Sequence, residues 1–98
     1  MKIIDDVLLL AFRLKGICEW CKRRGGVDPH HLFARGLGGG HRLDIEINLI
    51  SLCRTCHDAV HMGSIMRCDL LAIVARRERM TQDAILDAIR DLKRAPRL

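Results

Sequence analysis

Two Cys-x-x-Cys pairs constrain this 98-residue chain more than any other feature. The pairs are Cys18/Cys21 and Cys53/Cys56, with 31 residues between them. A two-residue gap lets both sulfurs of a pair bind one ion, and four thiolates fill the tetrahedral shell of Zn²⁺. The sequence therefore predicts a closed, structural zinc site that joins two distant segments. The alternatives are four buried cysteines without a metal and an iron–sulfur centre, and Cys68 is left over as a small core or surface residue.

The length allows one domain, residues 1–98, because the chain cannot enclose two hydrophobic cores. It contains two Phe, one Trp and no Tyr, so the core is expected to be aliphatic and to benefit from a structural metal. No segment has the length and hydrophobicity of a membrane span or the features of a secretion signal. We therefore expect a cytoplasmic protein without membrane contact, in a compartment where thiols stay reduced and bind metals.

The net charge of +5 favours a polyanionic partner without identifying it. Residues 67–98 contribute eight basic and five acidic side chains, and they include Arg76, Arg77 and Arg79. Such a cluster is either a solvated helix face or a patch that faces nucleic acid, and the sequence alone does not choose between them.

Helices are expected at both ends of the chain. Helical spacing of Ile4, Val7, Leu8, Ala11 and Leu14 predicts a helix over residues 3–15 whose apolar face packs on the core. Two further helices are expected within residues 67–95, over about 69–79 and 82–94, the second capped by Thr81.

Residues 16–63 are expected to form the core of the domain. A short segment at residues 31–34 and an alternation of apolar and polar residues at 45–48 indicate two strands, joined by a flexible glycine-rich segment. A helix is expected to start near Thr55, its N-cap, and to end before Gly63. The pattern predicts an α+β domain with flanking N- and C-terminal helices.

All five histidines lie between residues 30 and 61. His57 and His61 are four residues apart, so a helix places both imidazoles on one face, where they could bind one divalent ion. His30 and His31 are adjacent on an extended segment and face opposite ways, so one could bind the metal while the other accepts a proton. Taken alone, a histidine on an amphipathic helix is more often a hydrogen-bonded surface residue than a metal ligand, and Asn48 could be a turn residue.

Together, His31, Asn48 and His57 between the two cysteine pairs resemble the HNH endonuclease family, in its zinc-containing branch. The similar segments are CEWC, DPHHLFARG, the glycine-rich turn and IEINLISLCRTCHDAVH, which lie within residues 18–61. They cover about half of the chain, and small phage-encoded members of the family are similar to it in size.

The resemblance implies a ββα-metal (His-Me finger) core, two antiparallel strands and a helix, stapled by the four-cysteine zinc site. It implies that His31 is the general base, that His30 and His57 bind a divalent ion, and that Asn48 orders the loop that orients the base. His61 matches a further histidine of the colicin-type nucleases and is implied as a third ligand or a phosphate contact. Many family members have Asp at the position of His30, and an all-imidazole site would favour Zn, Ni or Co more than Mg.

The implied activity is hydrolysis of DNA phosphodiester bonds, by nicking or double-strand cleavage, with Mg²⁺, Mn²⁺, Ni²⁺ or Zn²⁺ as the catalytic ion. Arg42 or Arg35 could clamp the scissile phosphate, and Arg42 is favoured. Double-stranded DNA read with low sequence specificity is the expected partner, because few elements remain to read base edges. A phage-packaging or DNA-processing partner is consistent with the resemblance.

Other functions remain open on the sequence. A non-catalytic zinc module that binds nucleic acid would explain the cysteine pairs and the basic charge. A zinc domain that binds proteins through its C-terminal helices is a third possibility, and RNA is a variant substrate of the nuclease. Monomer and dimer are both compatible with the apolar faces of the last two helices.

Overall fold

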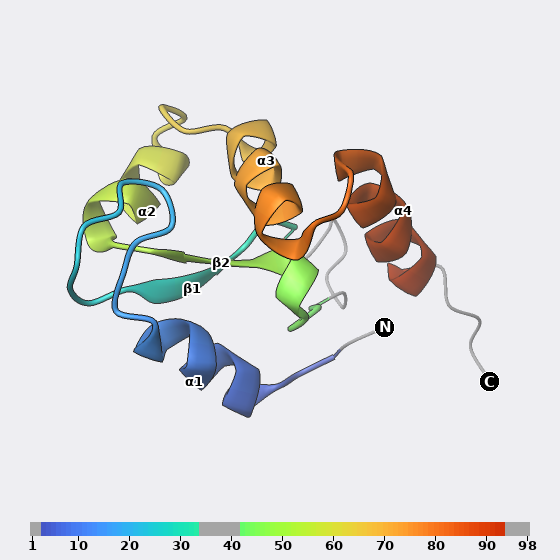
Figure 1. The fold of residues 1–98 in the computed structure, drawn as a ribbon, viewed down its shortest axis with the longest axis horizontal. Helices are drawn as coiled ribbons and strands as arrows, with labels where there is room; N and C mark the ends of the chain where they lie inside the picture. The colour runs from blue at the N-terminus through green and yellow to red at the C-terminus, as the bar shows by residue number, and fades with distance from the viewer. Residues whose placement is uncertain (1–2, 34–41, 94–98) are drawn as a thin grey trace.

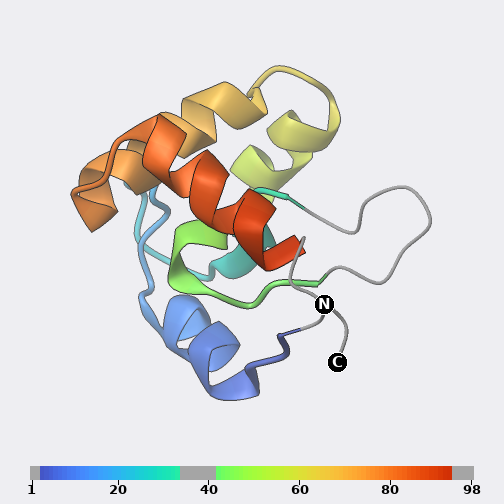
Figure 2. The same cartoon turned by 90° about the vertical axis from the view of Figure 1, so that its right-hand side faces the viewer.

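The computed structural model describes residues 3–33 and 42–93 as an α+β domain, in agreement with the predicted class. The elements in chain order are α1 (Asp6–Leu14), β1 (Asp28–His31), the 3-10 helix η1 (Glu46–Asn48), β2 (Leu49–Leu52), α2 (Arg54–His61), α3 (Arg67–Glu78) and α4 (Gln82–Lys93). A two-stranded sheet lies in the middle, with α1 on one side and α2 and α3 on the other (Figure 1). Helix α4 packs on the outside of α3 (Figure 2). Within this part of the chain no helix is long and apolar enough to cross a membrane.

The two strands pair antiparallel, with Asp28 opposite Leu52 and His31 opposite Leu49. Their positions differ from the prediction. The first strand was expected at residues 31–34 but ends at His31, and the second was expected at 45–48 but begins at Leu49. Every residue of β2 is buried, because helices cover both faces of the hairpin. A strand buried on both faces reads as a continuous apolar run, so an alternation rule misses it.

Helix α1 begins after Asp5, whose side chain accepts a hydrogen bond from the backbone N–H of Leu8 at 2.9 Å. It ends just before Gly16, which has a φ of +65°. Phe12 is buried, and Leu8 and Leu9 are half-buried against the strands. The predicted packing face was therefore wrong apart from Leu8. This helix is apolar on two sides, so periodicity did not determine which side faces the core, and the side with the large Phe12 ring does so.

Helix α2 starts at Arg54, with Cys53 at the N-cap position and without a side-chain cap. The prediction that Thr55 caps this helix was wrong, because the turn of the cysteine pair places Thr55 inside the first turn. Asp58 pairs instead with Arg54, at 3.5 Å. The helix ends at His61, before Gly63, as predicted. Gly63 has a φ of +83°, a conformation that glycine adopts readily.

The two C-terminal helices agree closely with the prediction. Thr81 caps α4 as expected, its hydroxyl accepting from the backbone N–H of Ala84 at 3.1 Å. Helix α3 starts two residues earlier than expected, because the Asp69 carboxylate accepts from the backbone N–H of Met66 at 2.9 Å and extends the first turn. The largest fully buried side chains include Leu43, Leu49, Ile50, Leu52, Leu70 and Ile85. The core is thus aliphatic, and it fills the space between the hairpin, α3 and α4.

Candidate metal centre and histidine pocket

The two cysteine pairs meet at one end of the hairpin. The Sγ atoms of Cys18, Cys21, Cys53 and Cys56 all lie within 4.8 Å of one another. None of the four forms a disulfide, and the Sγ atoms of Cys21 and Cys53 are 3.8 Å apart. Four thiol sulfurs at such distances can surround one soft or borderline ion such as Zn²⁺. The predicted grouping of the cysteines is confirmed.

The backbone around Cys18 favours a thiolate. The N–H of Cys21 points at its Sγ, at 3.5 Å, and the turn closes where the N–H of Lys22 donates to the Cys18 carbonyl at 2.9 Å. Burial alone raises the pKa of the Cys18 thiol, but hydrogen bonds from backbone N–H groups outweigh it and lower the pKa to about 6. Burial and the neighbouring sulfurs raise the pKa of Cys56. A divalent cation at the centre would favour the thiolate form of all four residues, so the donor set fits a structural metal.

Glu19, inside the first cysteine pair, connects this cluster to the rest of the fold. Its backbone N–H donates to the Ser51 carbonyl at 2.8 Å, and its Oε2 accepts from the Ser51 N–H at 2.6 Å. Its other oxygen accepts from Arg77 of α3 at 2.8 Å. Arg77 also donates to the Glu46 carbonyl at 2.6 Å. This member of the C-terminal arginine cluster therefore has an internal role, whereas Arg76 is exposed.

Three histidines predicted as ligands lie together between β1 and α2. The ring centroids of His30 and His57 are 5.2 Å apart, and those of His57 and His61 are 4.6 Å apart, with the rings edge to face. Their ligand nitrogens are spread more widely than the cysteine sulfurs. Among the residues that the structure describes, the four cysteines alone form a group of metal-binding side chains with all ligand atoms within 4.8 Å.

His30 is kept neutral by its surroundings. Burial lowers its pKa to about 4, and the nearby His57, His61 and Arg67 act in the same direction. A neutral imidazole is the form that binds a metal ion. The three histidines therefore have the chemistry of a metal site, but their ligand nitrogens do not lie as close together as the cysteine sulfurs do.

A pocket of about 380 Å³ opens beside these histidines. Its lining residues include His30, His31 and His61, together with Val60, Ile65, Met66 and Arg67. The Arg67 guanidinium lies 4.6 Å from the centre of the Phe33 ring, at the start of α3. Arg67 was not singled out from the sequence, because its place at the pocket depends on how α3 packs across the hairpin.

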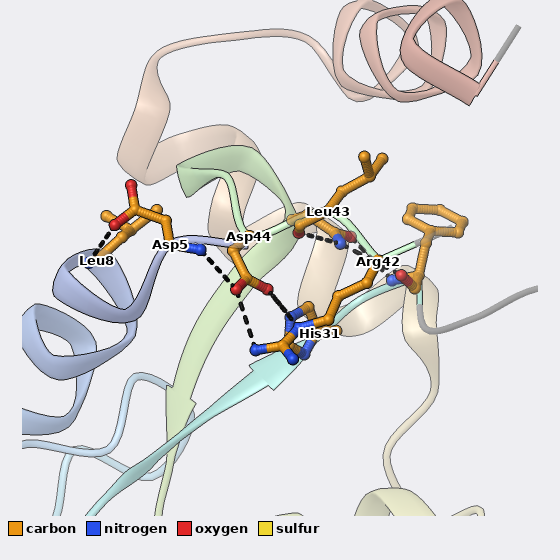
Figure 3. A network of polar contacts seen from close by, with 8 residues as sticks. Asp5, Leu8, His31, Arg42, Leu43 and Asp44 are labelled. Carbon is orange, nitrogen blue, oxygen red and sulfur yellow. Dashed lines mark hydrogen bonds and ion pairs between the residues drawn. The ribbon is translucent and has the colours of Figure 1, made fainter. Parts of the chain in front are cut away.

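His31 has a buried carboxylate as its partner, shown in Figure 3. Its Nε2 lies 2.7 Å from Oδ1 of Asp44, whose side chain has no solvent exposure. Asp44 also accepts from the Asp5 backbone N–H at 2.9 Å and from two guanidinium nitrogens of Arg42, each at 3.1 Å. Burial raises the pKa of Asp44, but these hydrogen bonds, led by that of His31, outweigh it and lower the pKa. Asp44 was not predicted as a site residue, because no periodicity or motif spacing marks it in the sequence.

Asn48 is fully buried and joins two segments that are distant in sequence. Its Oδ1 accepts from the Phe33 backbone N–H at 2.9 Å. Its Nδ2 donates to the carbonyls of Phe33, at 3.2 Å, and Leu43, at 2.9 Å. The contacts hold the chain on both sides of the glycine-rich segment, next to the strand that carries His31.

Arg42 and Arg35 were the two arginines expected to contact phosphate. Arg42 is half-exposed, and its Nε and Nη2 groups already bind Asp44. Arg35 lies outside the described residues.

Comparison of the chain with protein-family models, with curated proteins and with solved structures gives no match.

Proposed function

We propose that the protein is a metal-dependent endonuclease that hydrolyses DNA phosphodiester bonds. The observation that carries this proposal is the pocket in which His30 and His61 lie beside His31. His57 packs its ring against both His30 and His61. The hairpin-and-helix arrangement and the motif resemblance to the HNH family support the same activity.

His31 is proposed as the general base. It lines the pocket and its side chain is 24% exposed, so one side of the ring can meet a water molecule. The Asp44 carboxylate at Nε2 favours the tautomer with the proton on that nitrogen, which leaves Nδ1 free to accept a proton. The same carboxylate stabilises the imidazolium that forms when His31 takes the proton.

His30, His57 and His61 are proposed to hold the catalytic divalent ion. Three imidazoles suit Zn²⁺ and Ni²⁺ better than Mg²⁺ and Mn²⁺, which prefer oxygen ligands. Such an ion, when bound, neutralises charge on the phosphoryl oxygens and on the leaving 3′ oxygen. Asn48 is proposed to act indirectly, by fixing the backbone next to the strand of the base.

The distribution of free cations supports a nucleic-acid partner. Arg67 lies at the pocket, and exposed basic side chains follow the first cysteine pair and α3. Within residues 3–33 and 42–93, the following basic residues form no ion pair: Lys22, Arg23, Arg24, Arg67, Arg76 and Arg79. Arg67 and Arg76 are nine residues apart in α3, two and a half helical turns, so they lie on opposite sides of the helix. Arg67 is thus the unpaired cation that a phosphate in the pocket could contact, whereas Arg76 lies beside Lys22 at another part of the surface.

The same cations would serve a non-catalytic zinc module that binds nucleic acid, and this is the second candidate. Such a module needs the cysteine cluster and the basic surface but has no use for the paired His31 and Asp44. Cleavage separates the two functions, since binding to DNA is expected from both.

The test is cleavage of supercoiled plasmid with Mg²⁺, Mn²⁺, Ni²⁺ or Zn²⁺, on protein whose structural zinc has been quantified. We expect nicking or linearisation by the wild type, lowered about 10²- to 10⁴-fold by His31→Ala. Thr55→Ala, an exposed change on α2, is the matched control and should cleave normally. Folded, zinc-containing wild type that binds DNA but cleaves with none of these ions would favour the binding module. Equal cleavage by wild type and His31→Ala would remove His31 as the base.

A further inference from the structure

Helix α1 carries a second apolar face that the domain does not cover. We call it the α1 stripe; its members and their exposed fractions are Val7 79%, Leu10 51% and Leu14 73%. Ile4, 58% exposed, and Ile17, 40% exposed, lie in the segments that flank the helix. At 100° per residue, Val7, Leu10 and Leu14 point in nearly one direction, away from Phe12. The helix lies at the edge of the molecule in both views (Figures 1 and 2).

A helix with apolar residues on two sides is normally covered on both. The strands cover the side of α1 that carries Phe12, so covering the α1 stripe would require another partner. Single exposed apolar side chains would need no explanation, but Val7, Leu10 and Leu14 share one face of the helix, as the side chains of an interaction site do.

The charges beside the stripe indicate what that partner is. Asp6, in the first turn, and Arg13, in the last, are seven residues apart and so lie on the same flank of the helix. Asp6 forms no ion pair within the described part of the chain, and Arg13 pairs with Asp28 in an exposed contact at 3.1 Å. One flank thus carries an acidic group at its start and a basic group at its end.

We propose that the α1 stripe is the interface of a homodimer in which two α1 helices pack antiparallel. A two-fold axis perpendicular to both helices brings the same flank of each together in opposite directions. Asp6 of one copy then lies beside Arg13 of the other, twice in the dimer, and Leu10 lies near the axis. The inference does not rest on the proposed nuclease activity.

The pairing leaves the histidine pocket accessible. Helix α1 packs on one side of the hairpin, whereas the pocket is lined by β1, the end of α2 and the start of α3. One helix–helix contact is smaller than the ~1,200 Å² of typical stable interfaces. The dimer should therefore dissociate in the micromolar range and be visible as a concentration-dependent equilibrium.

Analytical ultracentrifugation from about 1 μM to about 1 mM protein covers that range of affinities. We expect a monomer–dimer equilibrium for the wild type and monomer only for Val7→Glu combined with Leu10→Glu. Both side chains are exposed, so the variant should fold and keep its zinc, which circular dichroism and metal analysis establish. Met62→Glu, at an 81% exposed apolar residue at the end of α2, is the matched control and should dimerise as the wild type does.

A charge exchange tests the antiparallel geometry. Asp6→Arg and Arg13→Asp should each weaken the dimer, and the double variant should recover at least half of the lost affinity on a logarithmic scale. The cycle isolates the Asp6–Arg13 coupling from the loss of the Arg13–Asp28 pair. Wild type that stays monomeric at every concentration, or a dimer that survives Val7→Glu with Leu10→Glu, overturns the proposal. Absence of recovery in the double variant overturns the antiparallel arrangement.

Discussion

The Nε2 atom of His31 lies 2.7 Å from Oδ1 of Asp44, and Asp44 is held in turn by Arg42 and the backbone N–H of Asp5. Because the carboxylate is fully buried and held from several sides, it restrains the ring of His31 and favours a proton on Nε2. This arrangement suits the general base that we propose His31 to be.

Asp44→Asn should lower the cleavage rate while leaving DNA binding intact. The amide keeps the shape of the carboxylate but cannot stabilise an imidazolium, and its NH₂ group disfavours a proton on Nε2 of His31. Loss of such a supporting partner typically costs about 10- to 100-fold in activity. Single-turnover cleavage and DNA titration of the same zinc-containing preparations give the two quantities. A matched fall in DNA affinity would show a structural role instead.

Asp44 should also contribute stability that is lost in acid. Its pKa is lowered in the folded state, so its contribution is present above the unfolded pKa and disappears as the pH falls through the folded pKa. Asp44→Asn should therefore be less stable than the wild type at pH 7, by about 1–3 kcal/mol. The gap should narrow below about pH 4. Urea unfolding of both proteins at several pH values measures this difference in the free energy of unfolding. Metal loss at low pH affects both proteins, so the difference between them reports the contribution of Asp44.

Cys53→Ser should prevent stable folding, since zinc binding and folding are coupled in small domains of this kind. Cys68→Ser is the matched control, because Cys68 is exposed and stands outside the four-sulfur cluster. Metal analysis should find at least one zinc per chain, and the same amount, in the wild type and in Cys68→Ser, with a sharp thermal transition in both. A folded Cys53→Ser protein without zinc would show that the cysteine cluster is dispensable.

Arg79→Gly should stabilise the protein. Arg79 ends α3 in the left-handed conformation, with a φ of 55°, which glycine adopts without steric cost. We expect a gain of about 0.5–1 kcal/mol in the free energy of unfolding. Arg76→Gly, inside the same helix, should lose about 1 kcal/mol, since glycine is a poor helix former. Urea unfolding of the two variants checks the opposite signs, and a loss in both would show that the Arg79 side chain stabilises the fold.

The cysteine cluster and the grouping of His57 with His61 were predictable, because short spacings and the geometry of one helix turn determine them. The strand positions were not, since β2 is buried on both faces and shows no alternation. Asp44 and Glu19 were not predicted as site residues for another reason. Each has a partner far away in the chain: Asp5 lies 39 residues from Asp44, and Arg77 lies 58 residues from Glu19. No local pattern encodes such pairs, which depend on how α1 and α3 pack across the hairpin.

Glu19 connects the cysteine cluster to α3 through Arg77, and the first residue of α3, Arg67, lies at the histidine pocket. Helix α3 therefore contacts both the segment of the cysteine cluster and the histidine pocket. Thermodynamic linkage is reciprocal, so if zinc at one end strengthens binding in the pocket, a molecule bound there must strengthen the retention of zinc by the same factor. Zinc release to a chelator would then report occupancy of a pocket that contains none of the zinc-binding cysteines.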